Sequence, residues 1–170
     1  MRLTHLKWLV VTCVLIVVAC NTSHHTANFS NPAVLTKESK FMVGEITSAV
    51  TFPPDVDYKT IWKKELKERL IERKILADAS DPQAITINAN VTDYERGSAW
   101  LRWAAGNLAG ETRLAVDASL TQQGAEIATV RADQKVNCCG LGSAGAWSYV
   151  FENVAEHVVF EVEKKMGTDD

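Results

Sequence analysis

The chain has 170 residues, of which 46% are hydrophobic and 23% charged, and is long enough for one globular domain beside a targeting segment. Its formal net charge of −3 argues against nucleic-acid binding, because affinity for a phosphate backbone comes largely from clustered Lys and Arg. The same acidic balance argues against electrostatic attraction to anionic lipid.

Residues 1–19 have the features of a secretory signal peptide. Arg2 and Lys7 provide positive charge before an apolar run from Trp8 to Ala19. The apolar region of a signal peptide has about 7–15 residues, whereas a helix that spans a bilayer needs about 20. A short membrane anchor or a buried helix is the alternative interpretation of this run.

The apolar run ends in Val17-Val18-Ala19-Cys20, which resembles the lipobox of bacterial lipoproteins, with Val where Leu is commoner. The resemblance implies cleavage before Cys20, diacylglycerol on its sulfur and a third acyl chain on its amine. Two or three acyl chains give persistent membrane attachment. Cleavage removes two basic residues and takes the net charge from −3 to −5. Asn21, in place of Asp, implies the outer membrane rather than the inner.

Residues 20–40 are expected to be the lipidated cysteine and a flexible tether, because they are polar, lack apolar periodicity and contain Pro32. A coil of this length has a mean span of roughly 25 Å, enough to lift a domain clear of the lipid headgroups. His24 and His25 lie in this segment, where we interpret the pair as incidental rather than as a metal site.

Residues 41–50 predict a first strand, because they are rich in Val, Ile, Thr and Phe and are followed by Pro53-Pro54. Asp57 is placed to cap a helix that runs to about Ala77. Apolar residues recur at three- and four-residue steps along this helix, at Tyr58, Ile61, Trp62, Leu66, Leu70 and Leu76. One face of the helix is therefore expected to be buried.

Three strands and a helix are predicted next. Apolar and polar residues alternate in residues 84–94 and again in 114–120, and Gln123-Gly124 turns the chain into a third strand at 127–136. The last helix covers about residues 146–165, and its buried stripe consists of Trp147, Val150, Phe151, Val154, Val158 and Val162.

Together these elements predict one α+β domain over residues 41–166, in the order β-α-β-β-β-α. The apolar faces are all buried if both helices pack on one face of a mostly antiparallel four-stranded sheet. A folded part of this size buries about two-thirds of its unfolded surface, so it needs no cofactor to fold.

Cysteine usage predicts neither a disulfide nor a metal site. Cys13 leaves with the signal peptide and Cys20 is used for lipidation, so Cys138 and Cys139 remain. Adjacent cysteines can close only a strained ring, and no second Cys or His pair has the spacing of metal ligands. We interpret Cys138 and Cys139 as small apolar residues at the end of a strand.

Residues 140–145 spell G-x-G-x-x-G between a strand and a helix, the order found in dinucleotide-binding turns. The second parallel strand of that unit, and the acidic residue that would hold a ribose, are absent from the sequence. We therefore interpret this segment as a flexible hinge in which Ser143 can cap the helix. Ser143 is not in a nucleophile elbow, because Leu141 stands where glycine is required.

The remaining candidates for catalysis are His157, Asp93 and Glu95. One helical turn separates His157 from Glu161 and from Asn153, so a surface hydrogen bond or ion pair is expected there. Asp93 and Glu95 face the same way near a strand end, where solvent exposure is expected rather than acid–base work. No catalytic set is predicted from these residues.

Residues 99–110 form an apolar connection between two strands and carry two of the five tryptophans. Connections of this kind are usually short and polar, and Trp is suited to lipid interfaces and to protein hot spots. The segment is either a contact patch, made by Trp100, Leu101, Trp103 and Leu108, or a turn buried under the sheet.

The sequence Tyr94-x-x-Gly97-x-x-x-Leu101-Arg102-Trp103, followed by two further glycines, resembles a family of bacterial lipoproteins whose domain has no assigned function. The likeness covers about residues 41–165 and departs at Asn107 and at the adjacent cysteines, where the family tends to have glycines. It implies no catalytic residues. The order of elements is also similar to that of small lipoproteins that are accessory subunits of outer-membrane assembly and export machines.

The sequence therefore predicts a lipid-anchored, non-enzymatic accessory module that docks on an envelope protein of an assembly or export system. The alternative is a periplasmic module that binds a lipid or another apolar ligand, with residues 99–110 as the lid of its pocket. The expected partners are the membrane, through the lipid on Cys20, and an envelope protein. No cofactor, nucleotide or nucleic acid is expected.

Overall fold

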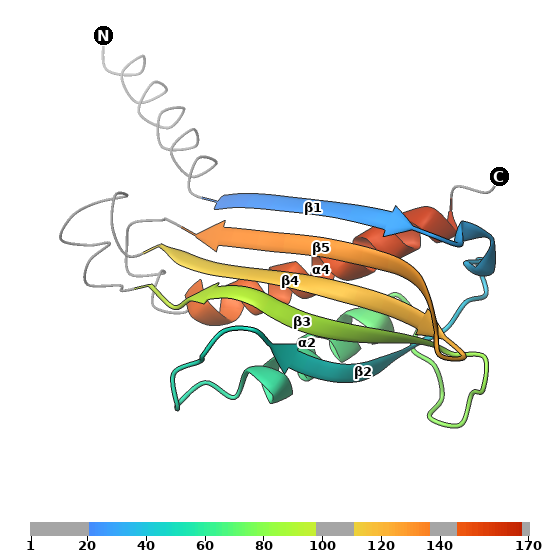
Figure 1. The fold of residues 1–170 in the computed structure, drawn as a ribbon, viewed down its shortest axis with the longest axis horizontal. Helices are drawn as coiled ribbons and strands as arrows, with labels where there is room; N and C mark the ends of the chain where they lie inside the picture. The colour runs from blue at the N-terminus through green and yellow to red at the C-terminus, as the bar shows by residue number, and fades with distance from the viewer. Residues whose placement is uncertain (1–20, 98–110, 137–145, 168–170) are drawn as a thin grey trace, which may run out of the picture.

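The computed structural model describes residues 21–97, 111–136 and 146–167. These form, in chain order, β1 (Asn21–Phe29), the 3₁₀ turn η1 (Pro32–Val34), β2 (Phe41–Ser48), α2 (Tyr58–Glu72), β3 (Ile85–Glu95), β4 (Thr112–Gln122), β5 (Ala125–Val136) and α4 (Ala146–Met166). The strands make one five-stranded sheet in the order β1-β5-β4-β3-β2 (Figure 1). All neighbours are antiparallel except β2 and β3, which are parallel and joined through α2.

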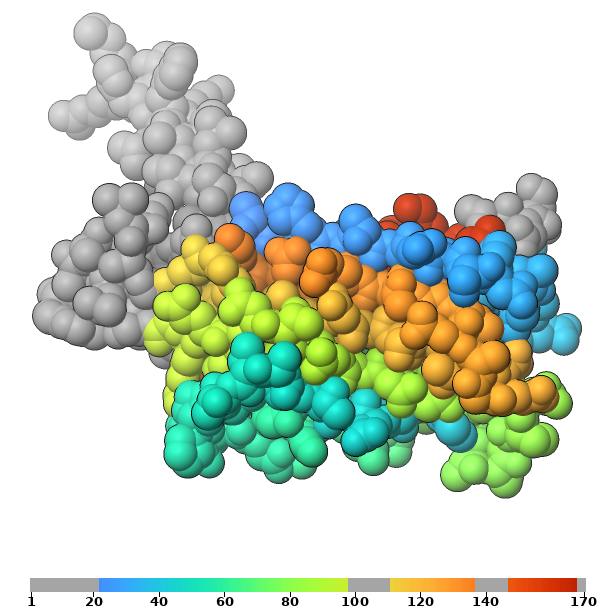
Figure 2. Space-filling model, viewed as in Figure 1, coloured from blue at the N-terminus to red at the C-terminus, as the bar shows by residue number. Residues whose placement is uncertain are grey.

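Both helices pack on one face of this sheet, α4 across β4 and β5 and α2 against β2 (Figure 1). The alternating apolar residues of β3 and β4, such as Ile87 and Val116, point into the core between sheet and helices. Arg73 joins the helices outside that core by pairing with Glu156 and Glu163. Figure 2 shows the opposite face of the sheet, which no other described element covers. No helix of the described residues is long and apolar enough to cross a membrane.

The α+β class is confirmed, but the predicted four strands and their order are wrong, because β1 was not expected. The predicted tether of residues 20–40 is also wrong for residues 21–29, which pair with β5 from Asn21↔Val136 to Phe29↔Ala128. Such a polar segment can form an edge strand, since one face and one edge stay in water while Ala27 and Phe29 pack against the core. Leu35, only 1% exposed, then fixes the chain to the domain.

Helix α2 begins as predicted and ends earlier than predicted. The Asp57 carboxylate accepts a hydrogen bond from the Thr60 amide, which caps the helix. The helix ends at Glu72 instead of about Ala77, and Lys74 has φ 60°. The chain beyond it bonds to the start of β2, where Phe41 exchanges 2.8 Å backbone hydrogen bonds with Ile75 and Ala77.

The predicted hairpin and last helix are confirmed. Gln123 and Gly124 have φ values of 51° and 83°, which suit a tight turn between twisted strands. The stripe of α4 is buried at Val150, Phe151, Val154, Val158 and Val162, and Trp147 is half-buried.

Candidate functional site

Several chain segments meet at one end of the domain, which we call the Asn21 end. It comprises Asn21, residues 95–97, residues 111–112, Val136 and residues 146–147. The pairings Asn21↔Val136, Thr112↔Val136 and Glu95↔Arg113 bring the strand ends together, as the left side of Figure 1 shows. The start of β1 therefore lies at the same end as the boundaries of segments 98–110 and 137–145.

Four aromatic rings pack together near the Asn21 end. Phe52 stacks on Tyr58 and on Tyr94 with centroid distances of 4.3 Å in both cases. Phe151 of α4 packs against the same two rings of Phe52 and Tyr94, at 6.3 and 5.8 Å. The Tyr94 hydroxyl is buried without a hydrogen-bond partner among the described residues. This cluster joins β3, α4 and the segment before α2, so it stiffens the domain where the apolar connection departs.

Arg96 connects several segments at the Asn21 end. Its guanidinium pairs with Asp55 at 2.5 Å and lies 5.5 Å from the centroid of the Trp147 ring. The hydrogen bond from Arg96 lowers the pKa of Asp55. The buried Thr112 hydroxyl donates to the Arg96 carbonyl oxygen at 2.7 Å, which ties together the two chain ends that flank residues 98–110.

A second polar cluster joins the edge strand to the last helix. His25 of β1 stacks on His157 of α4, with ring centroids 4.6 Å apart and planes 18° apart. His25 Nε2 lies 3.3 Å from Oε1 of Glu161, which is only 8% exposed. Burial, and then the neighbouring His25, lower the pKa of His157. The predicted partners of His157 were Glu161 and Asn153. The structure instead pairs the Glu161 carboxylate with His25, and the Asn153 side-chain amide donates to the Tyr149 carbonyl oxygen at 2.8 Å.

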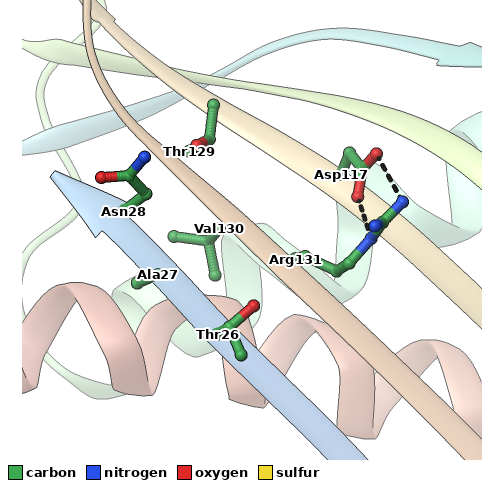
Figure 3. Close-up of a pocket in the computed structure, with 7 residues that line it drawn as sticks. All are labelled: Thr26, Ala27, Asn28, Asp117, Thr129, Val130 and Arg131. Carbon is green, nitrogen blue, oxygen red and sulfur yellow. Dashed lines mark hydrogen bonds and ion pairs between the residues drawn. The ribbon is translucent and has the colours of Figure 1, made fainter. Parts of the chain in front are cut away.

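The uncovered face of the sheet carries a groove of about 400 Å³ over β1, β4 and β5 (Figure 3). Its lining residues are Thr26, Ala27, Asn28, Asp117, Thr129, Val130 and Arg131. The two charged residues neutralise each other, since Arg131 Nε lies 2.8 Å from Asp117 Oδ1. The groove can therefore offer hydroxyl and amide hydrogen bonds to a polar ligand, without a net charge.

The residues that sequence patterns singled out are only partly within the described chain. Cys20 and the contact-patch residues Trp100, Leu101, Trp103 and Leu108 lie outside it, as do Cys138, Cys139 and the glycine-rich residues 140–145. Asp93 pairs with Arg113 at 3.1 Å. Within residues 21–97, 111–136 and 146–167, no three His, Cys, Asp or Glu side chains are grouped to hold a metal ion.

His25 is the residue to which the sequence did not point. The sequence predicts a tether at this position, and the structure shows β1 there instead. The available signal was an alternation in residues 24–29, where His25, Ala27 and Phe29 face the helices and the residues between them face water. The signal is weak because only two of those three side chains are apolar.

No family model matches the chain, and no curated protein sequence matches it. Two solved structures of the PelC dodecamer from Paraburkholderia phytofirmans resemble it. A variant of that dodecamer is 17% identical, with a TM-score of 0.45 over 81% of this chain and 96% of that chain. Another PelC dodecamer structure is 13% identical, with a TM-score of 0.46 over 79% of this chain and 97% of that one. A TM-score at this level carries no argument about function.

Proposed function

We propose that this protein is a lipoprotein held on the outer membrane by lipid on Cys20, where it acts as a non-enzymatic accessory module for an envelope partner in assembly or export. The main support is the position of β1, which begins at Asn21. A lipid on the preceding residue would be joined to the sheet without a spacer. The Asn21 end of the domain would then face the bilayer.

The arrangement of the Asn21 end also supports the proposed role of the apolar residues 99–110 in docking. Gly97 and Glu111 flank residues 98–110 and both belong to the Asn21 end. The described residues on either side of the predicted contact patch of Trp100, Leu101, Trp103 and Leu108 thus lie at the end that the proposed lipid would join. A partner embedded in the outer membrane would meet this end first, which favours docking there. Asp93, a candidate for catalysis, is paired with Arg113, in keeping with a non-enzymatic role.

Crosslinking in living cells tests the docking proposal. A photoreactive residue is placed at Trp100, at Trp103 or, as a control, at Ile71, which is 52% exposed near the far end of α2. We expect one envelope protein to be captured from Trp100 and Trp103 and not from Ile71. Phospholipid adducts would favour the alternative ligand-binding module, and equal capture from all three positions would contradict specific docking.

Two further measurements separate the parts of the proposal. Cys20→Ser should release the protein from the membrane fraction, and retention there would contradict the lipid anchor. Trp100→Ala and Trp103→Ala should leave stability nearly unchanged if these residues form a contact patch. Trp62→Ala is the matched control, because Trp62 is fully buried and its loss should cost about 3–5 kcal/mol.

A further inference from the structure

We propose that His25, His157 and Glu161 form an acid-sensitive latch that holds β1 on the domain and releases it when His157 is protonated. The cluster lies between an edge strand and a helix that otherwise belong to distant parts of the chain. Its effect on the distance between domain and membrane rests on the proposed function, but its effect on β1 does not.

Apart from the contacts of this cluster, few side-chain contacts hold β1 on the domain. None of the side chains of residues 22–29 is fully buried, and only Ala27 and Phe29 pack against the core. Backbone hydrogen bonds to β5 hold one edge of the strand, and no strand of the described residues pairs with its other edge. Segments with few buried apolar contacts open at low free-energy cost. A modest change at His25 is therefore enough to shift the balance between docked and released β1.

Glu161 is placed to pair with only one of the two rings. His25 Nε2 lies 3.3 Å from Glu161 Oε1, while His25 Nδ1 is buried without a hydrogen-bond partner among the described residues. His157 has no such partner, because its Nε2 is buried without a hydrogen-bond partner among the described residues. A charged His157 would also face a charged His25 ring at 4.6 Å. Two stacked cations with one carboxylate repel each other and favour separation of the strand from the helix.

The surrounding charges modify this balance without removing it. Glu156 and Glu161 of α4 and Asp133 of β5 favour the protonated form of His157, yet burial and His25 outweigh them, so the pKa of His157 is lowered. Lys164 lies 3.8 Å from Glu161 Oε1 and competes for the carboxylate that His25 uses. Phe160 packs on His25 in a T-shaped arrangement, with ring centroids 5.8 Å apart.

The sign of the pH effect follows from the lowered pKa of His157. A released strand leaves His157 with a pKa nearer the ordinary value of about 6.5, so the released state binds more protons below that pH. Docked β1 is therefore most stable above about pH 6.5 and loses stability as the pH falls toward the lowered pKa.

Release would change the reach of the lipid anchor. Leu35 stays fixed in the core, so the freed segment would run from Cys20 to that residue. A coil of this length has a mean span of about 20 Å. With β1 docked, the domain would rest on the membrane; with β1 released, it would stand off by about that distance.

Hydrogen exchange of the full mature protein in detergent micelles tests the latch. Peptides covering β1 and β4 are compared at pH 7.5 and pH 5.0, after correction for the intrinsic pH dependence of exchange. We expect protection of β1 to be lower at pH 5.0 than at pH 7.5, with protection of β4 unchanged. Unchanged protection of β1 in the parent protein would overturn the proposal.

Variants locate the effect. His157→Gln should abolish the pH dependence of β1 protection, whereas His24→Gln, a change on the exposed face of the same strand, should leave it intact. Glu161→Gln should loosen β1 already at pH 7.5. If the protection of β1 still falls at pH 5.0 in His157→Gln, another group causes the pH effect and the latch proposal is overturned. Cys20→Ser should give the same exchange result as the parent, so failure of the lipid anchor would be seen separately.

Discussion

The rings of Tyr94 and Phe52 stack with centroids 4.3 Å apart, which holds the end of β3 against the segment that follows β2. This contact buries the Tyr94 hydroxyl without a hydrogen-bond partner among the described residues. Burial raises the pKa of Tyr94, with a smaller effect of Asp55 in the same direction and an opposing effect of Arg96. The ring of Tyr94, rather than its hydroxyl, therefore contributes to stability at this position.

We expect Tyr94→Phe to be at least as stable as the parent at pH 7, because the ring stays and an unpaired buried hydroxyl is removed. The raised pKa means that the folded parent holds its phenolic proton longer than the unfolded chain does. The parent therefore loses stability relative to the variant as the pH rises above about 10. Urea unfolding of both proteins from pH 7 to pH 11 measures this difference, and parallel curves would contradict it.

Truncation of two phenylalanines of α4 should lower the free energy of unfolding by different amounts. Phe151 is fully buried against the aromatic cluster, so Phe151→Ala should lower the free energy of unfolding by about 3–5 kcal/mol. Phe160 is 43% exposed on the same helix, and Phe160→Ala should cost much less. Chemical denaturation of the two variants provides the comparison. Similar losses would mean that Phe160 is more deeply packed than the structure shows.

The cap of α2 gives a prediction with a conservative control. Asp57→Ala removes the oxygen that accepts from the Thr60 amide, so the melting temperature should fall by a few degrees. Asp57→Asn keeps an acceptor oxygen and should retain most of the stability. Thermal unfolding followed by circular dichroism separates the two. An equal fall in both variants would assign the effect to charge at the helix start.

Gly44 should not tolerate a side chain. A Cβ at this position would lie 2.2 Å from Asn88 Oδ1 and 2.5 Å from Thr86 Cγ2. The same Asn88 oxygen accepts from the Glu45 amide at 2.9 Å, so Gly44→Ala would disturb that bond as well. We expect a loss of about 1–3 kcal/mol in urea unfolding. Gly124→Ala is the control for backbone strain alone, because φ is +83° there and open space surrounds the added Cβ.

The interior of the fold could be predicted from the sequence because its apolar residues follow clear periods. In β3 and β4, every second residue is apolar and faces the core, as Ile87 and Val116 do. In α4, Val150 and Val154 are four residues apart and lie on the buried stripe. The end of α2 was misplaced because Leu76 was counted with the apolar face of the helix, although it lies six residues after Leu70 and so breaks the three- and four-residue spacing. In the structure, Leu76 forms a parallel β-bridge with Phe41 of β2, and its side chain packs against the core, partly buried.

The edge strand and the site next to it could not be predicted for a related reason. A strand at the edge of a sheet needs little apolar surface, because its stability comes mainly from backbone pairing and from one face. The alternation of His25, Ala27 and Phe29 is too short and too polar to stand out from a linker. Because β1 was not predicted, His25 was not recognised as part of the folded domain. Cys20 and the patch around Trp100 and Trp103 lie outside the described residues and stay predictions.

The irregularity in β2 affects how neighbouring molecules could meet on a crowded surface. Residues between Val43 and Ile46 break the register with β3, and the Glu45 amide turns inward to Asn88, so the outer row of donors along β2 is interrupted. β1, at the opposite edge, is regular over nine residues. Of the two sheet edges in the described part of the chain, one is thus suited to pairing. If the proposed lipid anchor gathers copies of the domain on one membrane, two copies can pair through this edge, and growth of a continuous sheet would stop at the second molecule.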